Sequence, residues 1–532
     1  MTSQQRFGIH NGPGFVPTAG AGVAAAETDA IAAADLRLIA ALKDYIPHAM
    51  RLTGTPGLNI ALARRGEVIW DEGFGYADLA TRAPMTAETV AHSGSMAKVY
   101  TAIAALQLVE RGVIALDGPI NDYLKGVRAE NPLGKREITV RDLLTHRSGL
   151  NENAAGSMYR IPPPLADHVR DGYAADTFRS YARSMTRRWG CEVGERFIYS
   201  NFGMATLGYV IECANPEGLS FSDYIQRHVV EPLGMASTQF PPVQAPPHVR
   251  PEIADRYSTG YAALGHVLVK TPTVYFADFP AGGVVTIPRE HIRLLLALAN
   301  KGRYGDAQLL RPETVEAMLT PQTEMGVSGL GVPIQFGLGI QLTDVGTPHR
   351  SFAHGGAHMF GWVNQFRAYP ALDFAYAVFT NHWTLLPTRT GEALMIDDFI
   401  RTWVRNETGG VGAERGEPPR DWAWKTSYVA GLAMAEQLMG LLGIEDPLSE
   451  AAVAAMARDA VLHADAPNIS SGWDPEAFRA GLADLQALPM TIESIRQALT
   501  SGAFKVTAEE LATIGRQFGL PGSPILMSAG EA

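Results

Sequence analysis

The N-terminal part of the chain shows one stretch with helical periodicity. From Thr28 to about Leu52 apolar residues recur every three or four positions, at Leu36, Leu38, Ile39, Leu42, Tyr45 and Ile46. This spacing predicts a helix with one apolar face that packs on a sheet. Residues 1–27 are rich in glycine, alanine and proline and lack such a period, so they are interpreted as a loose arm.

Strand patterns occur at both ends of the following 350 or so residues. Leu58–Ala63 and Glu67–Trp70 predict a hairpin around Arg64–Gly66, and later strands are expected at Phe336–Leu342, Trp362–Tyr369 and Phe374–Thr380, the last two joined by a turn at Pro370–Asp373. The stretch from 95 to about 240 is predicted to be mostly helical, whereas 151–188 and 242–280 resemble long loops. We therefore expect an α/β sandwich with a helical subdomain and an active site in the cleft between them.

The C-terminal quarter of the chain differs in composition from the rest. Glycine and proline cluster in 406–425, which predicts a linker between a domain at 28–405 and a helical extension at 426–532. Three roles remain open for the extension: packing on the first domain, mediating association, or covering the cleft.

Composition and charge exclude several classes of function. With 532 residues, 46% of them hydrophobic, the chain can bury a large core. A net charge of −11 offers no basic surface for nucleic acid, and no apolar run is long enough for a membrane span. Cys191 and Cys213 fit neither a zinc site nor a disulfide framework, so reduced thiols are expected. We expect no metal and no cofactor. Partners are thus a small-molecule or peptide substrate, with homo-oligomerisation left open.

The first residues, Met1–Pro13, lack the basic leader and continuous apolar core of a secretory signal. A cytoplasmic location is therefore expected. A periplasmic location is expected only if a leader has been removed.

Ser95-Met96-Ala97-Lys98 places a hydroxyl and an amine one helical turn apart at the start of an alanine-rich run. A serine needs an adjacent base to become a nucleophile, and a lysine shielded from water can serve as one. The same spacing also occurs on solvated helices, so the interpretation depends on what accompanies it.

Tyr199-Ser200-Asn201 precedes a second apolar run that predicts a buried helix. A phenol next to a lysine ammonium becomes a usable base, so Tyr199 could take the proton of Ser95, while Asn201 could hold the amide or ester of a substrate. The alternative is a tyrosine that caps the core and an asparagine that closes a turn.

His354-Gly355-Gly356 lies in a segment that suits a strand passing a ligand. Two glycines let a substrate lie against the backbone, and the amide of Ala357, with that of Ser95, could hold a developing oxyanion. The alternative is a glycine bulge with buried histidines. A metal pair of His354 and His358 is unfavourable because glycines adjoin it and carboxylates are absent.

The three motifs, in this order, resemble the serine β-lactamase and penicillin-binding-protein superfamily, in particular its class C β-lactamase and D-alanyl-D-alanine carboxypeptidase-like branch. The similarity spans about residues 35 to 400 and includes further strings at 108–120, 138–150, 230–235 and 281–285. It implies a β-lactamase-like sandwich, an antiparallel sheet flanked by helices, with Ser95 as the acylated nucleophile. It also implies that Lys98 and Tyr199 share proton transfer and that Asn201 orients the substrate.

One position departs from the pattern of many relatives, which carry a lysine where this chain has His354. A neutral histidine gives up a permanent positive charge, so binding of a β-lactam carboxylate is expected to weaken. The expected activity is therefore that of a serine hydrolase cleaving a peptide or ester, including linear non-ribosomal or toxin-derived peptides. The alternatives are a carboxylesterase or weak β-lactamase, and a non-catalytic acyl-ligand-binding sensor of the same fold.

Overall fold

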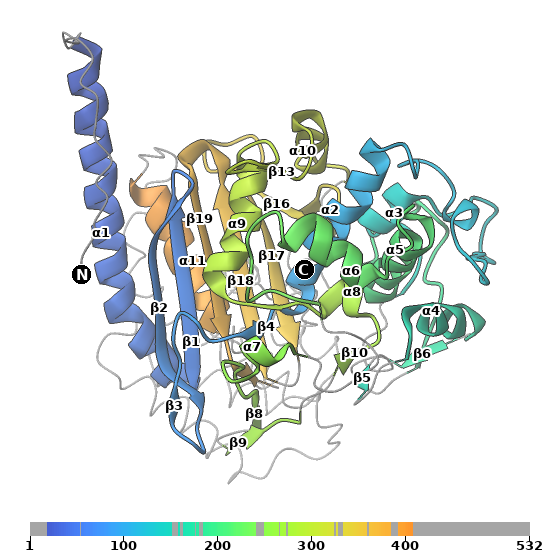
Figure 1. Ribbon diagram of the computed structural model, residues 1–532, viewed down its shortest axis with the longest axis horizontal. Coiled ribbons are helices and arrows are strands. Elements are labelled where there is room, and N and C mark those ends of the chain that lie inside the picture. The colour runs from blue at the N-terminus through green and yellow to red at the C-terminus, as the bar shows by residue number, and fades with distance from the viewer. Residues whose placement is uncertain are drawn as a thin grey trace, which may run out of the picture.

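The computed structural model describes thirteen stretches of the chain (Figure 1). They are 19–53, 55–151, 158–159, 163–175, 177–179, 185–240, 249–264, 267–272, 275–323, 326–327, 333–358, 361–384 and 392–407. The predicted helical extension at 426–532, and the predicted linker beyond Glu407, lie outside these residues and stay predictions. None of the described helices combines the length and apolarity needed to cross a bilayer.

The main sheet of the described region has nine strands, in the order β14-β15-β16-β17-β18-β19-β1-β2-β3, and every neighbouring pair is antiparallel. The strands are β1 (Gly57–Arg64), β2 (Glu67–Asp78), β3 (Ala83–Pro84), β14 (Gly326–Val327), β15 (Pro333–Phe336), β16 (Gln341–Thr343), β17 (Ser351–His358), β18 (Trp362–Tyr369) and β19 (Phe374–Thr380). β1 from the start of the domain pairs with β19 from its end, so the sheet combines strands from the two ends where strand patterns occur.

Alternation of side chains along the central strands explains why both faces of the sheet are covered. On β1, Leu58, Ile60 and Leu62 belong to the apolar cluster beneath α1 (Ala19–Thr53) and α11 (Glu392–Glu407), whereas the alternate alanines Ala61 and Ala63 belong to the core on the other face. Small residues on that second face let the helix α9 (Pro288–Ala299) pack closely over β1, β18 and β19. The expected sandwich with an antiparallel sheet between helices is confirmed (Figure 1).

The first helix, α1, begins at Ala19 rather than at Thr28, so residues 19–27 of the predicted arm are helical. The alanines of this segment have the highest helix propensity, and they extend the helix although they carry no amphipathic period. The prediction of a loose arm over these residues was wrong. Residues 1–18 lie outside the described part.

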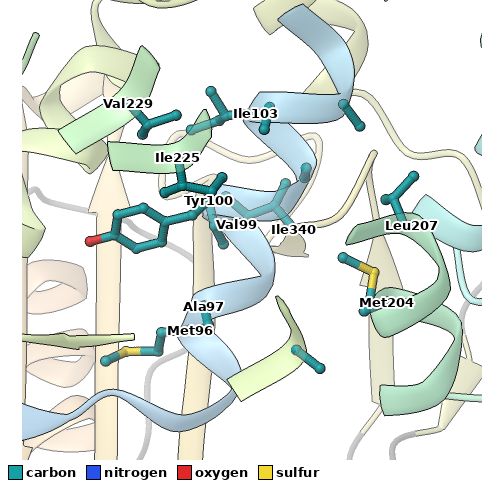
Figure 2. Close-up of a cluster of buried hydrophobic side chains, with 14 of the residues drawn as sticks. Met96, Ala97, Val99, Tyr100, Ile103, Met204, Leu207, Ile225, Val229 and Ile340 are labelled. Carbon is teal, nitrogen blue, oxygen red and sulfur yellow. The ribbon is translucent and has the colours of Figure 1, made fainter. Parts of the chain in front are cut away.

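The helical subdomain is built around α2 (Ala97–Glu110), which is buried over most of its circumference. Figure 2 shows α2 packing against α5 (Asn201–Ala214) and against side chains near Ile225 and Val229. The remaining helices and turns are α3 (Val140–Leu144), α4 (Leu165–Ala174), α6 (Phe221–Ile225), α7 (Pro251–Ala254), α8 (Phe279–Gly282), α10 (Pro312–Met318), η1 (Gly94–Met96), η2 (Ile120–Asp122), η4 (Gln226–Val230) and η5 (Pro370–Leu372).

Short strands make up small sheets at the periphery. They are β4 (Ala91–His92) with β11 (Val285–Thr286), β5 (Met158–Tyr159) with β10 (Tyr275–Phe276), β6 (Thr177–Arg179) with β7 (Met185–Arg187), β12 (Arg303–Tyr304) with β13 (Ala307–Gln308), and the group β8 (Tyr261–Leu264), β9 (Val267–Lys270) and β20 (His382–Thr384). Several lie in 151–188 and 242–280, which also contain α4, α7 and the start of α8. The prediction of long loops there was wrong. Most of these elements are too short to show a period, but α4 is an amphipathic helix of ten residues that the prediction missed.

The strand predicted at Phe336–Leu342 is interrupted. β15 ends at Phe336 and β16 begins at Gln341, with a tight turn between them. Gly339 adopts a φ of +75°, and a side chain on Gly337 would lie 1.9 Å from the carbonyl oxygen of Met318. Gly339 allows the turn and Gly337 allows the close approach to Met318, while the apolar Leu338 and Ile340 gave this segment the pattern of a continuous strand.

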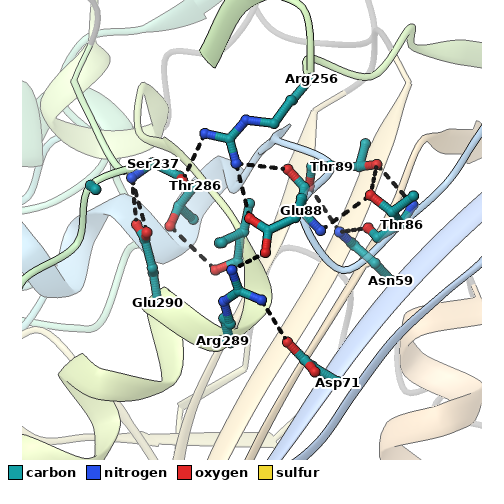
Figure 3. A network of polar contacts seen from close by, with 12 residues as sticks. Asn59, Asp71, Thr86, Glu88, Thr89, Ser237, Arg256, Thr286, Arg289 and Glu290 are labelled. Carbon is teal, nitrogen blue, oxygen red and sulfur yellow. Dashed lines mark hydrogen bonds and ion pairs between the residues drawn. The ribbon is translucent and has the colours of Figure 1, made fainter. Parts of the chain in front are cut away.

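A polar network anchors the segment that leads to Ser95 (Figure 3). Glu88 forms ion pairs with Arg256 and Arg289, and Arg289 also binds Asp71 on β2 at 2.9 Å. The buried Asn59 of β1 donates to the carbonyl oxygen of Thr89 at 2.8 Å. The approach to the η1 turn is thereby tied to the sheet and to α9.

Candidate active site

Ser95 lies in the η1 turn that leads directly into α2, and Lys98 lies in the first turn of that helix. Lys98 is 1% exposed, whereas Ser95 is only partly buried. The Lys98 Nζ donates a hydrogen bond to the Ser95 Oγ at 3.0 Å. The one-turn spacing therefore produces the contact expected from the sequence.

The Lys98 amine has two further hydrogen-bond acceptors. It donates to the Asn201 Oδ1 at 2.6 Å and to the carbonyl oxygen of Ala281 at 2.8 Å. An amide oxygen and a backbone carbonyl can only accept, so both contacts favour the ammonium form of the lysine. This ammonium also lies 4.8 Å from the centre of the Tyr199 ring.

The start of α5 places Tyr199 and Asn201 at the site. Ser200 caps the helix, because its Oγ accepts from the backbone amide of Gly203 at 3.0 Å. Asn201 is the first residue of the helix and Tyr199 the last residue before the cap. The centre of the Tyr199 ring lies 4.5 Å from that of His146 and 6.4 Å from that of His354.

Glycines bring strand β17 into backbone contact with η1. A side chain on Gly356 would lie 1.8 Å from the carbonyl oxygen of Ser93, and one on Gly94 would lie 2.8 Å from the amide nitrogen of Ala357. The Gly94–Ser95 backbone therefore runs beside that of Gly356–Ala357. This is the arrangement that a two-amide oxyanion hole requires.

His354 is buried and neutral. Its Nδ1 lies 2.6 Å from the carbonyl oxygen of Gly355, which can only accept, so Nδ1 carries the proton. Burial and the nearby Lys98 lower the pKa of His354 to about 3. Its Nε2 is therefore a lone-pair acceptor, and it has no hydrogen-bond partner within the described part of the chain.

Two contributors were not singled out from the sequence. The carbonyl oxygen of Ala281 and the ring of His146 appeared there only within strings that resemble relatives. Every residue has a backbone carbonyl, so the residue type at 281 does not predict this contact. The two glycines after Ala281 indicate only that another part of the chain can approach the backbone closely there. The ring stacking of His146 on Tyr199 follows from a fold contact that spacing does not reveal.

No group of three or more histidine, cysteine, aspartate or glutamate side chains suited to a metal ion occurs in the described ranges. The side chain of His358 is not among the described parts of the chain.

Comparisons with known proteins show which family the chain resembles. The family model described as Beta-lactamase matches residues 42–398. Protein Rv1367c of Mycobacterium tuberculosis is 26% identical over 353 residues, covering 60% of this chain and 84% of that protein. Esterase EstB of Burkholderia gladioli is 31% identical over 208 residues, covering 38% of this chain and 52% of that protein.

A solved class C β-lactamase of Rhodobacter sphaeroides shares the fold, with a TM-score of 0.51 and 20% identity, covering 69% of this chain and 98% of that one. The family match extends over more than half of the sequence and includes all three motifs. The chain belongs to the β-lactamase family, within the superfamily of serine β-lactamases and penicillin-binding proteins.

Proposed function

We propose that the protein is a serine hydrolase that forms an acyl-enzyme on Ser95 from an ester or a peptide amide and releases the acid by attack of water. The observation that carries the proposal is the position of the Lys98 Nζ, 3.0 Å from the Ser95 Oγ and 2.6 Å from the Asn201 Oδ1. A serine hydroxyl on a buried, fixed ammonium, beside a phenol and a glycine-lined strand, supplies the groups that acyl transfer requires.

In the proposed acylation step Lys98 stays an ammonium and Tyr199 acts as a phenolate. The Ser95 Oγ attacks the substrate carbonyl carbon while its proton passes to the Tyr199 oxygen. The amides of Ser95 and Ala357 hold the oxyanion, and the carbonyl then re-forms as the leaving alcohol or amine takes the proton from Tyr199. Water repeats the sequence on the acyl-enzyme. Asn201 orients the substrate while its Oδ1 holds Lys98.

His354 favours substrates without a carboxylate next to the scissile bond. Its ring is buried and neutral, so it offers no positive charge and a β-lactam carboxylate gains no ion pair from it. The similarity to an esterase supports the same preference. We therefore propose ester cleavage above cephalosporin cleavage, with linear non-ribosomal or toxin-derived peptides as a further substrate class.

The test is a turnover panel of short-chain p-nitrophenyl esters, a chromogenic cephalosporin, D-alanyl-D-alanine peptides and linear peptides. The hydrolase proposal expects turnover of at least one ester or peptide that Ser95→Ala abolishes. Stoichiometric acylation without turnover would instead indicate the non-catalytic acyl-binding sensor.

A further inference from the structure

His146 holds the segment that carries Tyr199 through three separate contacts. Its carbonyl oxygen accepts from the amide of Ile198 at 2.8 Å, and its Nδ1 accepts from the amide of Ser200 at 3.2 Å. Its ring lies against that of Tyr199, with centroids 4.5 Å apart and planes inclined by 36°. His146 thus binds the residue before Tyr199 and the residue after it, and its ring covers one face of the tyrosine.

The backbone of His146 is in an unusual conformation for its surroundings. Its φ is +54°, and of the non-glycine residues with positive φ in the described ranges it alone is buried, at 1% exposure. Residues with side chains seldom adopt this region, and a buried example indicates that the neighbourhood holds it there. Phe336 and Phe197 meet the ring edge-on at 5.2 and 5.7 Å and fix its plane.

The hydrogen bond from Ser200 requires an unprotonated Nδ1. An amide can only donate, so this nitrogen must offer a lone pair. Burial, followed by the charge of Lys98, lowers the pKa of His146 well below its ordinary value. The ring is therefore neutral and suited to accept.

We propose that His146 is a positioning residue that fixes the Tyr199 phenol against the Lys98 ammonium, with its Nδ1 as the essential acceptor. The inference rests on the proposed function, because it acts through the base role assigned to Tyr199. His146 itself transfers no proton.

Two substitutions separate the acceptor from the ring. In His146→Asn the Oδ1 occupies the place of Nδ1, and asparagine tolerates a positive φ. In His146→Gly the backbone conformation is kept without strain while both acceptor and ring are lost. His168→Ala is the matched control, since it removes another buried histidine, one whose ring packs edge-on at 5.8 Å against Phe202 of α5.

The measurement is the rate constant of Ser95 acylation by a p-nitrophenyl ester, with KM and kcat determined separately and folding checked by circular dichroism. Glycine should lower the acylation rate constant about 100-fold, the size of one general acid–base contribution, with little change in KM, whereas asparagine should stay within about 10-fold of wild type. His168→Ala should leave the rate constant unchanged.

The double variant His146→Gly/Tyr199→Phe provides a readout that a merely structural role would not produce. If His146 acts through Tyr199, the double variant is no slower than Tyr199→Phe alone, because the two changes remove one function. The inference would be overturned if the fold-losses in the acylation rate constant of the two single variants multiplied in the double variant. It would also be overturned if His146→Asn were as slow as His146→Gly. An unchanged rate in Tyr199→Phe alone would instead overturn the base role in the proposed function.

Discussion

Lys98 and Asn201, 103 positions apart in the chain, meet in a 2.6 Å hydrogen bond that joins the first turn of α2 to the first turn of α5. The sequence alone indicated that Asn201 holds substrate. In the structure the Asn201 Oδ1 also accepts a hydrogen bond from Lys98 and so helps to hold that lysine in place. The site is consequently assembled by the packing of two buried helices.

Replacing Lys98 tests the charge at the centre of this arrangement. Lys98→Met keeps a long chain in a buried position and removes the ammonium, so Ser95 and Tyr199 lose their shared partner. We expect acylation to slow by about 100-fold or more, measured by single-turnover kinetics with a p-nitrophenyl ester. Lys98→Ala should behave alike, which separates loss of charge from loss of volume. Wild-type rates in both variants would remove Lys98 from the mechanism.

The adjacent glycines of β17 give a matched pair of substitutions. Gly356→Ala would place a methyl group 1.8 Å from the Ser93 carbonyl oxygen, forcing β17 away from η1 and opening the oxyanion hole. Loss of one oxyanion donor costs about 100-fold or more in kcat.

Gly355→Ala is the control. Its methyl group would meet only the end of the Gln365 side chain at 2.9 Å and the Asn364 carbonyl oxygen at 3.9 Å, and a flexible amide can move. Steady-state kinetics should show near-normal kcat for this variant, because losing the predicted substrate contact at Gly355 would change KM and leave the oxyanion hole intact. Equal losses in the two variants would contradict the backbone contact as the reason for Gly356.

Several strands and turns of the main sheet were predictable because they depend on residues close together in the sequence. The turn of the β1–β2 hairpin contains Arg65 and Gly66, both with positive φ, as two-residue hairpin turns require. The observed bounds of β18 and β19 equal those predicted, since the turn at Pro370–Asp373 separates the two strands and β19 is an almost continuous apolar run.

The parts that could not be predicted depend on tertiary contacts. The third acceptor of Lys98 is the backbone carbonyl of Ala281, a contact that no side-chain type predicts. The His146–Tyr199 stacking similarly joins two loops that are distant in sequence. Motif order suggested which residues converge, but only the fold shows which atoms touch.

Acid should destabilise the protein through its buried histidines. Burial lowers the pKa of His92 to about 3, so between pH 6.5 and 3 the unfolded chain binds a proton there and the folded chain does not. Stability is then full above pH 6.5 and falls as the pH drops, by about 1.4 kcal/mol per pH unit for one histidine.

His92→Phe should make this slope shallower by that amount, because phenylalanine binds no proton in the unfolded chain. Its aromatic ring can keep the edge-on contacts with Trp362 and Tyr257, so the fold should be retained. Urea unfolding between pH 4.5 and 6 measures the difference. Parallel pH dependences in the two proteins would show that His92 is not held neutral.

The neutral His354 makes a prediction about substrate preference. We expect kcat/KM for a short-chain ester to exceed that for a chromogenic cephalosporin, because no charge at His354 meets the β-lactam carboxylate. Paired steady-state assays at pH 7 make the comparison. A cephalosporin kcat/KM of about 10⁷ M⁻¹s⁻¹, near the upper enzymatic range, would contradict this interpretation of His354.

The most direct test of the account is the intact mass of the protein after incubation with a fluorophosphonate. We predict one covalent adduct on the folded wild-type chain, located at Ser95 by peptide mapping, and none on Ser95→Ala. A folded wild-type protein that stays unlabelled, or an equal adduct on Ser95→Ala, would contradict the claim that Ser95 is the nucleophile.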